Sequence, residues 1–336
     1  MPPPPSITLS PTSPLVDPTR STDIQPTPTT TFYEHPDPER TVLPHLLPHL
    51  PRSTTQLYLT RAHLPGTVLA SFPPTSPPTP EETWSTARLD LARPGDTQCW
   101  FWCSLEASLD TRHNASPDAS TADIPIPTWS LASTHLTSFL IHIANTHPAL
   151  PALLLGSLSR ALFARLPPSQ ITYSSSWAKM VFSSAALTPA DARLREAYAF
   201  RPLDEDDFEA VERTSTVKRT RETLRRSSNT GAYLLSPPPP AAVATDRVPA
   251  SAWCFLSREG SISTLYVAPP SRGHGLGKAT MRHQLLEAFR DRPYTTAEVS
   301  TSNGASLALC RSMGARRDEG WDVVWAGVSL DAYRGA

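Results

Sequence analysis

The alternation of apolar and polar residues is clearest in the part of the chain after residue 256. Residues 262–268 form a short, largely apolar run that favours a strand, and a turn with Gly273, Gly275 and Gly277 follows it. Beyond the turn, apolar side chains recur at about 100° per residue along one side of a predicted helix, at Ala279, Leu285, Leu286 and Phe289. The pattern therefore predicts a strand, a glycine turn and a helix in succession.

The residues around this unit predict further elements of a mixed sheet. Apolar runs favour strands at 231–235, 252–256, 295–301 and 321–328, and residues 257–260 favour a hairpin turn. Residues 200–211 predict a strand that runs into a helix with an acidic first turn, as the helix dipole favours. A second helix over 216–226 has five basic residues, which favour either a solvated face or contact with an anionic substrate or a ribose phosphate: Lys218, Arg219, Arg221, Arg225 and Arg226.

The N-terminal half has weaker patterns. Short strands are predicted at 57–60, 67–72, 99–103, 171–173 and 180–182. The apolar stretch 136–166 is interrupted by His, Asn, Pro and Arg, so it predicts a pair of buried or half-buried helices and not a membrane span. The order of strands, helical block and strand indicates a second α+β unit.

Proline and glycine are distributed unevenly. Only three of the 38 prolines, but nine of the thirteen glycines, lie after residue 256. Residues 1–35, rich in Pro, Ser and Thr, predict a disordered tail because they have little apolar surface to bury. We therefore expect an α+β protein with a tail at 1–35, an N-terminal domain at 41–185 and a C-terminal domain at 199–336.

Charge and cysteine content narrow the function classes. The formal net charge of −1 gives no electrostatic reason to expect nucleic acid. Four cysteines at scattered positions indicate neither a disulfide framework nor a zinc site, and we expect no metal. With no secretory signal in the sequence, we expect a reduced, cytoplasmic setting and no membrane association.

The glycine turn is a candidate anion site. Backbone N–H groups converge where a strand passes through such a turn into a helix, and the helix dipole adds partial positive charge. A Walker-type loop needs glycine at position 272 and Ser or Thr at 279, where this chain has Arg272 and Ala279. A dinucleotide fingerprint needs glycine at 278 or 280, where Lys278 and Thr280 stand. The remaining candidate ligand is the diphosphate of a different kind of cofactor or co-substrate.

The motif Arg-x-x-Gly-x-Gly at 272–277 resembles the acyl-coenzyme A loop of the GNAT superfamily of N-acetyltransferases. A second motif, Asn303-x-x-Ser306-x-x-x-Cys310-x-x-x-Gly314, is similar to the GNAT segment that has Tyr where this chain has Cys310. The resemblance covers about 199–330 and implies a GNAT fold. The order of elements and residues 50–53 resemble the N-terminal half of glycine N-acyltransferase-like proteins, a degenerate GNAT fold.

The resemblance implies direct acyl transfer from acyl-CoA, with acetyl-CoA or another thioester as co-substrate, to an amine. It places the pantetheine along Leu265, Tyr266 and Val267, with Asn303 and Ser306 beside it. It places the diphosphate on the loop residues Arg272, Gly273, His274, Gly275, Leu276, Gly277 and Lys278. One backbone N–H of the strand would stabilise the oxyanion.

The acid and the base are the open part of the site. Ser261 stands where glycine N-acyltransferase has its proposed Glu base. Glu298 alternates in phase with Thr296 and Ser300, so it is either a base in the cleft or a solvated strand carboxylate. Cys310 is either the proton donor to the leaving thiolate or a small packing residue. His274 and His283 are expected to be structural or exposed.

Three functional hypotheses remain at this point. The first is an acyl-CoA-dependent N-acyltransferase acting on a small-molecule amine or an amino acid. The second is a protein N-acetyltransferase, for which the Pro-rich tail would suit docking. The third is a non-catalytic acyl-CoA-binding protein that has lost its proton-transfer groups.

Overall fold

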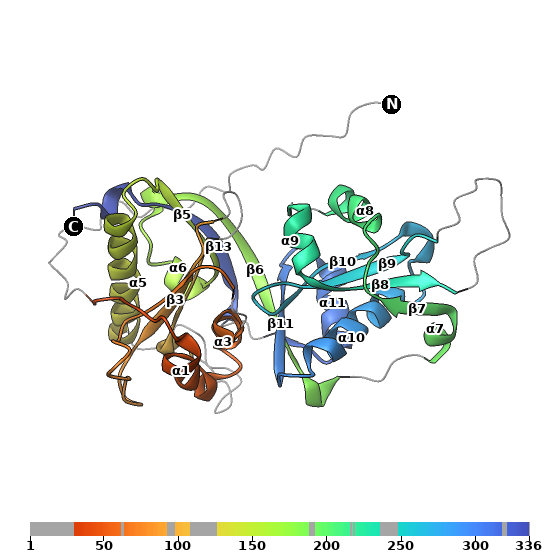
Figure 1. The fold of residues 1–336 in the computed structure, drawn as a ribbon, viewed down its shortest axis with the longest axis horizontal. Helices are drawn as coiled ribbons and strands as arrows, with labels where there is room; N and C mark the ends of the chain where they lie inside the picture. The colour runs from red at the N-terminus through yellow and green to blue at the C-terminus, as the bar shows by residue number, and fades with distance from the viewer. Residues whose placement is uncertain are drawn as a thin grey trace.

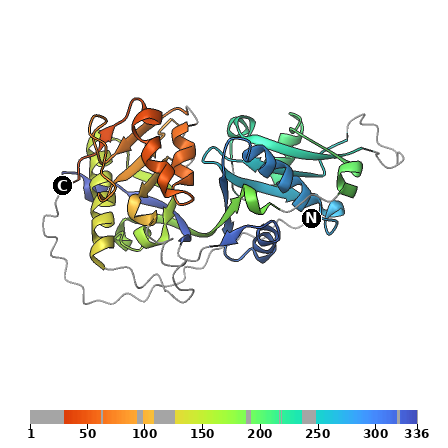
Figure 2. The same cartoon turned by 90° about the horizontal axis from the view of Figure 1, so that it is seen from below.

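The computed structural model describes residues 30–335 except 62–63, 93–97, 108–125, 188–191, 216, 218, 236–247 and 318–320. Its strands form one mixed sheet in the order β1-β2-β3-β4-β5-β13-β6-β11-β10-β9-β8-β7, with β12 (Arg316–Arg317) pairing with β6 beside this path. Figures 1 and 2 show two halves side by side, with β6 (Ile171–Ser183) passing from one to the other. The expected α+β class is confirmed. Residues 1–29 of the expected tail lie outside the described residues.

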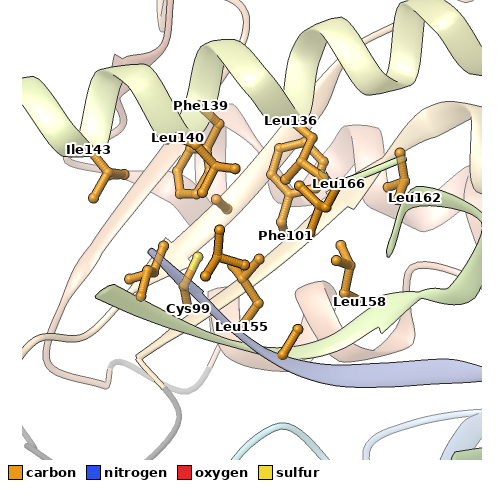
Figure 3. Packing of buried hydrophobic residues seen from close by; sticks show 14 of the residues in the cluster. Cys99, Phe101, Leu136, Phe139, Leu140, Ile143, Leu155, Leu158, Leu162 and Leu166 are labelled. Carbon is orange, nitrogen blue, oxygen red and sulfur yellow. The ribbon is translucent and has the colours of Figure 1, made fainter. Parts of the chain in front are cut away.

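The N-terminal half of the sheet lies between two helical layers. Its strands are β1 (Tyr33–Glu34), β2 (Thr67–Ala70), β3 (Ser85–Leu89), β4 (Cys99–Cys103) and β5 (Ala152–Ser159). The long helix α5 (Ile126–Thr146) packs Leu136, Phe139, Leu140 and Ile143 onto Phe101 and Leu155 (Figure 3). Apolar side chains of the other face form a second cluster with the short helices α1 (Pro38–Thr41), α2 (Leu43–Leu46) and α3 (Thr54–Arg61).

The C-terminal half of the sheet is also covered on both faces. Its strands are β7 (Tyr198–Arg201), β8 (Ser228–Leu234), β9 (Ala252–Leu256), β10 (Ser261–Val267) and β11 (Tyr294–Ser300). Because successive side chains of a strand point to opposite faces, Trp253 and Phe255 pack with α8 (Asp207–Thr214) and α9 (Arg221–Arg226). Cys254 and Leu256 pack on the other face with α10 (Leu276–Ala288) and α11 (Gly304–Ser312). A further short helix, α7 (Ala192–Ala197), precedes β7.

The last long strand, β13 (Val323–Ser329), lies in the N-terminal half of the sheet. It is a strand, as its apolar pattern predicted, but it pairs with β5 on one side and β6 on the other. The chain therefore leaves the C-terminal half after α11 and completes the N-terminal half. This is a departure from the expectation of one continuous unit over 199–336.

Two sequence-based predictions for the N-terminal half are wrong, and a third is correct in type but incomplete in extent. Residues 57–60 lie in α3 and not in a strand, and 152–159 are β5 and not the second of two helices. The predicted strands at 171–173 and 180–182 are the ends of one long strand, β6. The chain is also ordered before the expected start at residue 41, since β1 pairs with β2 and Phe32 is buried. In the C-terminal half, the predicted helix over 216–226 is shorter, because α9 begins at Arg221.

The turn between β9 and β10 depends on glycine at position 260. Gly260 has φ = +74°, and a Cβ there would overlap the ring of Tyr58, which lies on α3. Left-handed backbone costs about 1–2 kcal/mol for a residue with a side chain, and overpacking costs about 1–3 kcal/mol more. We expect Gly260→Ala to lower the free energy of unfolding by about 2–5 kcal/mol, measured by urea denaturation.

Gly273→Ala is the matched control for this substitution. Gly273 has φ = +81°, and nothing lies within 4 Å of an added Cβ, so it isolates the backbone cost. Equal losses in both variants would show that the Tyr58 contact contributes nothing to stability.

Candidate active site

A cleft opens where β10 and β11 separate. The two parallel strands pair only at Ser261 with Thr296 and at Ile262 with Ala297, and beyond these positions they diverge. The cleft between them has a volume of about 900 Å³. The other edge of β11 stays fully paired with β6 from Tyr294 to Ser300, so only the edge toward the cleft is open.

A bulge interrupts β10 beside the cleft. The pairing of β10 with β9 shifts by one residue between Ser263 and Tyr266, and Thr264 there has φ = +51°. Bulges of this kind bend a strand and re-aim its groups, and they recur beside active sites. Leu265 and Tyr266 line the cleft, whereas Val267 does not. The open edge offers the backbone groups that a pantetheine arm would pair with in the manner of an added strand.

The glycine loop follows β10 at the edge of the cleft and leads into α10. Its residues do not line the cleft, and residues 272–275 are exposed. Gly273 and Gly275 are both left-handed, and Gly275 is the N-cap of α10 with no side-chain hydrogen bond. Within the described part of the chain, the backbone N–H groups of 273–278 donate to no backbone carbonyl; the first one bonded is Ala279 N, to Gly275 O at 3.1 Å. The N–H groups that an anion needs are thus available.

The two cations of this loop have carbonyl partners instead. Arg272 Nε donates to Val267 O at 2.9 Å, and Lys278 Nζ donates to Ser312 O at 2.9 Å, a carbonyl at the end of α11. Gly277 permits close packing of helix on strand, because a Cβ there would lie 3.0 Å from Val267 Cγ2. Both side chains therefore have a hydrogen-bond partner within the protein, whereas the main-chain N–H groups of 273–278 have no backbone carbonyl partner among the described residues.

The second sequence motif begins α11 and lines the cleft with Asn303, Ser306 and Cys310. Asn303 is the N-cap, and its Oδ1 accepts a hydrogen bond from Ser306 N at 3.0 Å. This is the ordinary role of Asn before a helix. Asn303 is exposed and lines the cleft, where the pantetheine contact is predicted.

Glu298 lies on the open edge of β11, in the lining of the cleft, with 9% of its side chain exposed. Its Oε1 accepts hydrogen bonds from Ser157 Oγ at 2.5 Å and Lys179 Nζ at 3.4 Å, and its Oε2 accepts one from Trp325 Nε1 at 2.5 Å. The strand carboxylate is therefore held by three donors and is not solvated. The three donors come from three different strands, β5, β6 and β13.

A second bulge brings Ser157 to this carboxylate. Between Val324 and Ala326 of β13, β5 has an extra residue, and Ser157 there has φ = +55°. Its hydroxyl accepts from Lys179 Nζ at 2.6 Å while it donates to Glu298. Non-glycine residues in left-handed backbone cost about 1–3 kcal/mol and cluster at functional sites.

The lysine beneath Glu298 belongs to a wider buried network. Lys179 Nζ also donates to Thr55 Oγ1 at 3.0 Å and lies 5.1 Å from the ring centroid of Trp321. Arg52 also packs on Trp321, with its guanidinium carbon 4.6 Å from the centroid of the indole ring. Burial raises the pKa of the Glu106 carboxyl to about 7, against the opposing effects of the Cys103 N–H and the charges of Lys179 and Arg52. Through Lys179, this network connects Thr55 on α3 of the N-terminal half to Glu298 on β11 of the C-terminal half.

Cys310 is a buried wall of the cleft. Burial raises the pKa of its thiol to about 12, with the opposing effects of the backbone and Arg311 smaller. A thiol leaving group has an ordinary pKa of about 8.5, so transfer of a proton from Cys310 to a departing thiolate is uphill. This geometry favours the packing role over the role of proton donor.

We therefore expect Cys310→Ala to keep turnover within about twofold of wild type, because general acid catalysis is not lost. Steady-state release of thiol from acetyl-CoA measures this. Cys254→Ala is the matched control, since Cys254 is equally buried in the same apolar cluster but does not line the cleft. A loss of tenfold or more confined to Cys310→Ala would instead make the thiol the acid.

Two charged residues of the cleft were not among the expected acid, base or coenzyme-binding residues, although Arg219 belongs to the basic run that the sequence singled out. Glu259, in the turn before Gly260, is buried, and burial raises the pKa of its carboxyl while the charge of Arg219 opposes the shift. Arg219 comes from the segment between α8 and α9 and also lines the cleft. In the sequence, Glu259 lies in the predicted hairpin turn at 257–260, and Arg219 lies in the basic run at 216–226. In that run Arg221, Arg225 and Arg226 pair with Glu212, Glu205 and Glu222, respectively.

Four aromatic side chains of the lining were also missed: Tyr173 and Trp177 on β6, Trp253 on β9 and Trp325 on β13. Other candidates have structural roles. Ser261 is buried and its hydroxyl donates to Thr296 O at 3.3 Å, as expected of a turn residue. His274 is exposed in the loop, and His283 stacks on Phe200 with centroids 5.6 Å apart.

Among the described residues, no group of three or more His, Cys, Asp or Glu side chains could hold a metal ion. The four cysteines are buried and free. None of the helices in the described ranges is long and apolar enough to cross a membrane.

Two family models match adjoining parts of the chain. The N-terminal domain of the acyl-CoA N-acyltransferase verG matches residues 28–196, half of the chain, and the acetyltransferase (GNAT) family matches residues 197–315. A comparison with curated proteins finds no match.

Several solved structures are similar at low identity. A Drosophila protein is 15% identical, with 89% of this chain and 99% of that chain covered and a TM-score of 0.55. A tandem GNAT protein from the clavulanic acid biosynthesis pathway is 13% identical, covering 89% and 98%, with a TM-score of 0.42. A glucosamine N-acetyltransferase region of a fungal β-N-acetylglucosaminidase is 11% identical, covering 90% and 38%, with a TM-score of 0.43. On the strength of the family models, this chain belongs to the GNAT superfamily of acyl-CoA N-acyltransferases.

Proposed function

We propose that this protein transfers an acyl group, acetyl in the expected case, from acyl-CoA to the amine of a small molecule or amino acid. Membership of the GNAT family supports acyl transfer from acyl-CoA. The observation that carries the finer proposal is the Glu298 carboxylate, held by three donors on the open edge of β11. This is a base fixed in place at the point where the two strands separate.

The donor side of the proposal uses main-chain groups. The N–H groups of 273–278 would bind the diphosphate, since no described carbonyl accepts from them. The bulged edge of β10 at Leu265 and Tyr266 would pair with the pantetheine. One of its N–H groups would then stabilise the oxyanion, an effect worth about 3–4 kcal/mol in other enzymes.

The acceptor side of the proposal uses Glu298. The amine loses a proton to the carboxylate and its nitrogen attacks the thioester carbonyl. The C–N bond forms, the C–S bond breaks, the nitrogen gives a second proton to the departing thiolate, and the carboxyl group returns the first proton to water. Because Ser157, Lys179 and Trp325 fix both carboxylate oxygens, the base is oriented before the acceptor arrives.

A thiol-release assay with acetyl-CoA tests this function. Acylation of free amines or amino acids, verified by mass spectrometry of the product, supports the proposal. Acylation of peptides alone would overturn it in favour of a protein N-acetyltransferase. Calorimetric binding of acetyl-CoA without turnover on any amine would overturn it in favour of a non-catalytic binder.

A further inference from the structure

The cleft has an aromatic wall, made of Tyr173, Trp177 and Trp325, that the acyl-CoA chemistry does not use. Tyr173 is 53% exposed, which is unusual for a large ring on a central strand of a sheet. Single exposed rings are common, but three that line one cleft form a patch that marks a binding surface. None of the three comes from the strands that flank the predicted pantetheine path.

Strand register places this wall on the same face as the proposed base. Residues opposite one another in an antiparallel pair share a face, and Glu298 pairs with Lys179 while Ser300 pairs with Trp177. Tyr173 and Trp177 follow the same alternation along β6. Trp325 pairs with Ser175 between them, so the wall extends from Glu298 across β6 and β13.

Trp325 connects the wall to the reacting atoms. Its Nε1 lies 2.5 Å from Glu298 Oε2, so an amine that gives its proton to Glu298 lies beside the indole ring. Next to Tyr173, the opposite position on β13 is Gly327, where an added Cβ would lie 2.5 Å from Thr172 Oγ1. Glycine at this position therefore leaves room for the Thr172 hydroxyl beside Tyr173.

The charges of the lining fit a cationic amine with an apolar body. Glu298 and Glu259 are the carboxyl groups of the lining, Arg219 is its guanidinium, and Lys179 is buried beneath the surface. An ammonium group is attracted by carboxylates and by the faces of tryptophan rings, and a flat ring packs best on other rings.

We propose that the acceptor is a primary amine attached, through a short linker, to an aromatic ring that packs on Tyr173, Trp177 and Trp325 while the amine reaches Glu298. This inference rests on the proposed function and names the acceptor class of the same site. Trp325 lies at the carboxylate and Tyr173 lies at the exposed end of the wall. The linker lets the amine reach Glu298 while the ring stays on the wall.

Three amines test the proposal with acetyl-CoA as donor. 2-Phenylethylamine has an aromatic ring, 2-cyclohexylethylamine has a saturated ring of similar size, and propylamine has no ring. The expected kcat/KM for 2-phenylethylamine is about tenfold or more above that for propylamine, and severalfold above that for 2-cyclohexylethylamine, because ring-on-ring packing adds to apolar burial. Equal values for the three amines, or a preference for glycine, would overturn the aromatic acceptor while leaving acyl transfer intact. Failure of these three amines and of every free amino acid would overturn both proposals together.

Variants of Tyr173 separate the wall from the rest of the site. Tyr173→Ala is expected to raise KM for 2-phenylethylamine about tenfold, with little change in KM for propylamine. Tyr173→Phe is expected to keep KM for 2-phenylethylamine close to wild type, because it retains the ring that packs on the acceptor. Tyr33→Ala is the matched control, since Tyr33 is an exposed strand tyrosine on β1 outside the cleft lining. An equal effect of Tyr173→Ala on all amines, or none, would contradict the proposal.

Discussion

Glu298→Gln is expected to lower kcat for acyl transfer about 10²–10⁴-fold, the usual contribution of a positioned general base. Glutamine keeps the size of the side chain and its carbonyl oxygen still accepts from Ser157 or Trp325, but it cannot take a proton from the amine. Acetyl-CoA affinity, measured by calorimetry, is expected to stay close to wild type because the glycine loop is untouched. Steady-state kinetics with an accepted amine give the rate.

A structural effect of this substitution must be separated from a chemical one. Glu298→Gln leaves the buried Lys179 without its nearest carboxylate, and breaking a buried pair costs about 3–5 kcal/mol. The double variant Lys179→Met with Glu298→Gln removes both charges, so its unfolding free energy is expected to recover while kcat stays low. If the double variant recovered activity together with stability, Glu298 would be a structural residue and not the base.

The local patterns of the sequence were sufficient for the part of the site that is built locally. The glycine turn, its strand and its helix lie within 30 residues, and the structure has β10, the loop and α10 in that order. Asn303 precedes a helix with the spacing of an N-cap, and its side chain caps α11. Strict alternation also placed Glu298 on a single face with Thr296 and Ser300, and Glu298 and Ser300 line the cleft.

The errors in the N-terminal half come from elements without a polar face. In α3, every residue from Thr54 to Thr60 is buried, so no amphipathic period marks the helix. The run Ala152–Ser159 is likewise apolar on both faces, and such a run fits a buried helix and a buried strand equally well. Contacts with segments far away in the sequence, which no local window contains, decide both: β5 pairs with β4 and β13, and α3 packs on the face of β3 and β4.

The partners of Glu298 were missed for a related reason. Ser157, Lys179 and Trp325 lie on three different strands, and they meet because β13 inserts between β5 and β6. A one-residue shift of register would turn each side chain to the other face. Ser157 in particular reaches the carboxylate only through the bulge of β5, and nothing in Gly156-Ser157 alone predicts it.

Gly275→Val is expected to reduce affinity for acetyl-CoA at least about 100-fold, since losing two charge-assisted hydrogen bonds costs about 3 kcal/mol or more. Gly275 is left-handed at φ = +80°, a conformation that a β-branched residue does not tolerate, so the turn must change. The N–H groups of 275–277 then no longer converge. Isothermal calorimetry with acetyl-CoA measures the loss.

The fold is expected to survive this substitution, which makes the result interpretable. The nearest atom to an added Cβ at Gly275 is Leu194 Cδ1 at 3.6 Å, an ordinary contact, and the loop is exposed. Lys278→Ala is the matched control in the same loop, because Lys278 Nζ already donates to Ser312 O and its loss is expected to cost at most severalfold in affinity. A folded Gly275→Val protein with wild-type affinity would show that the main chain of 273–278 does not hold the diphosphate. If Lys278→Ala lost more affinity for acetyl-CoA than Gly275→Val, the lysine side chain and not the backbone amides would be the main contact with the diphosphate.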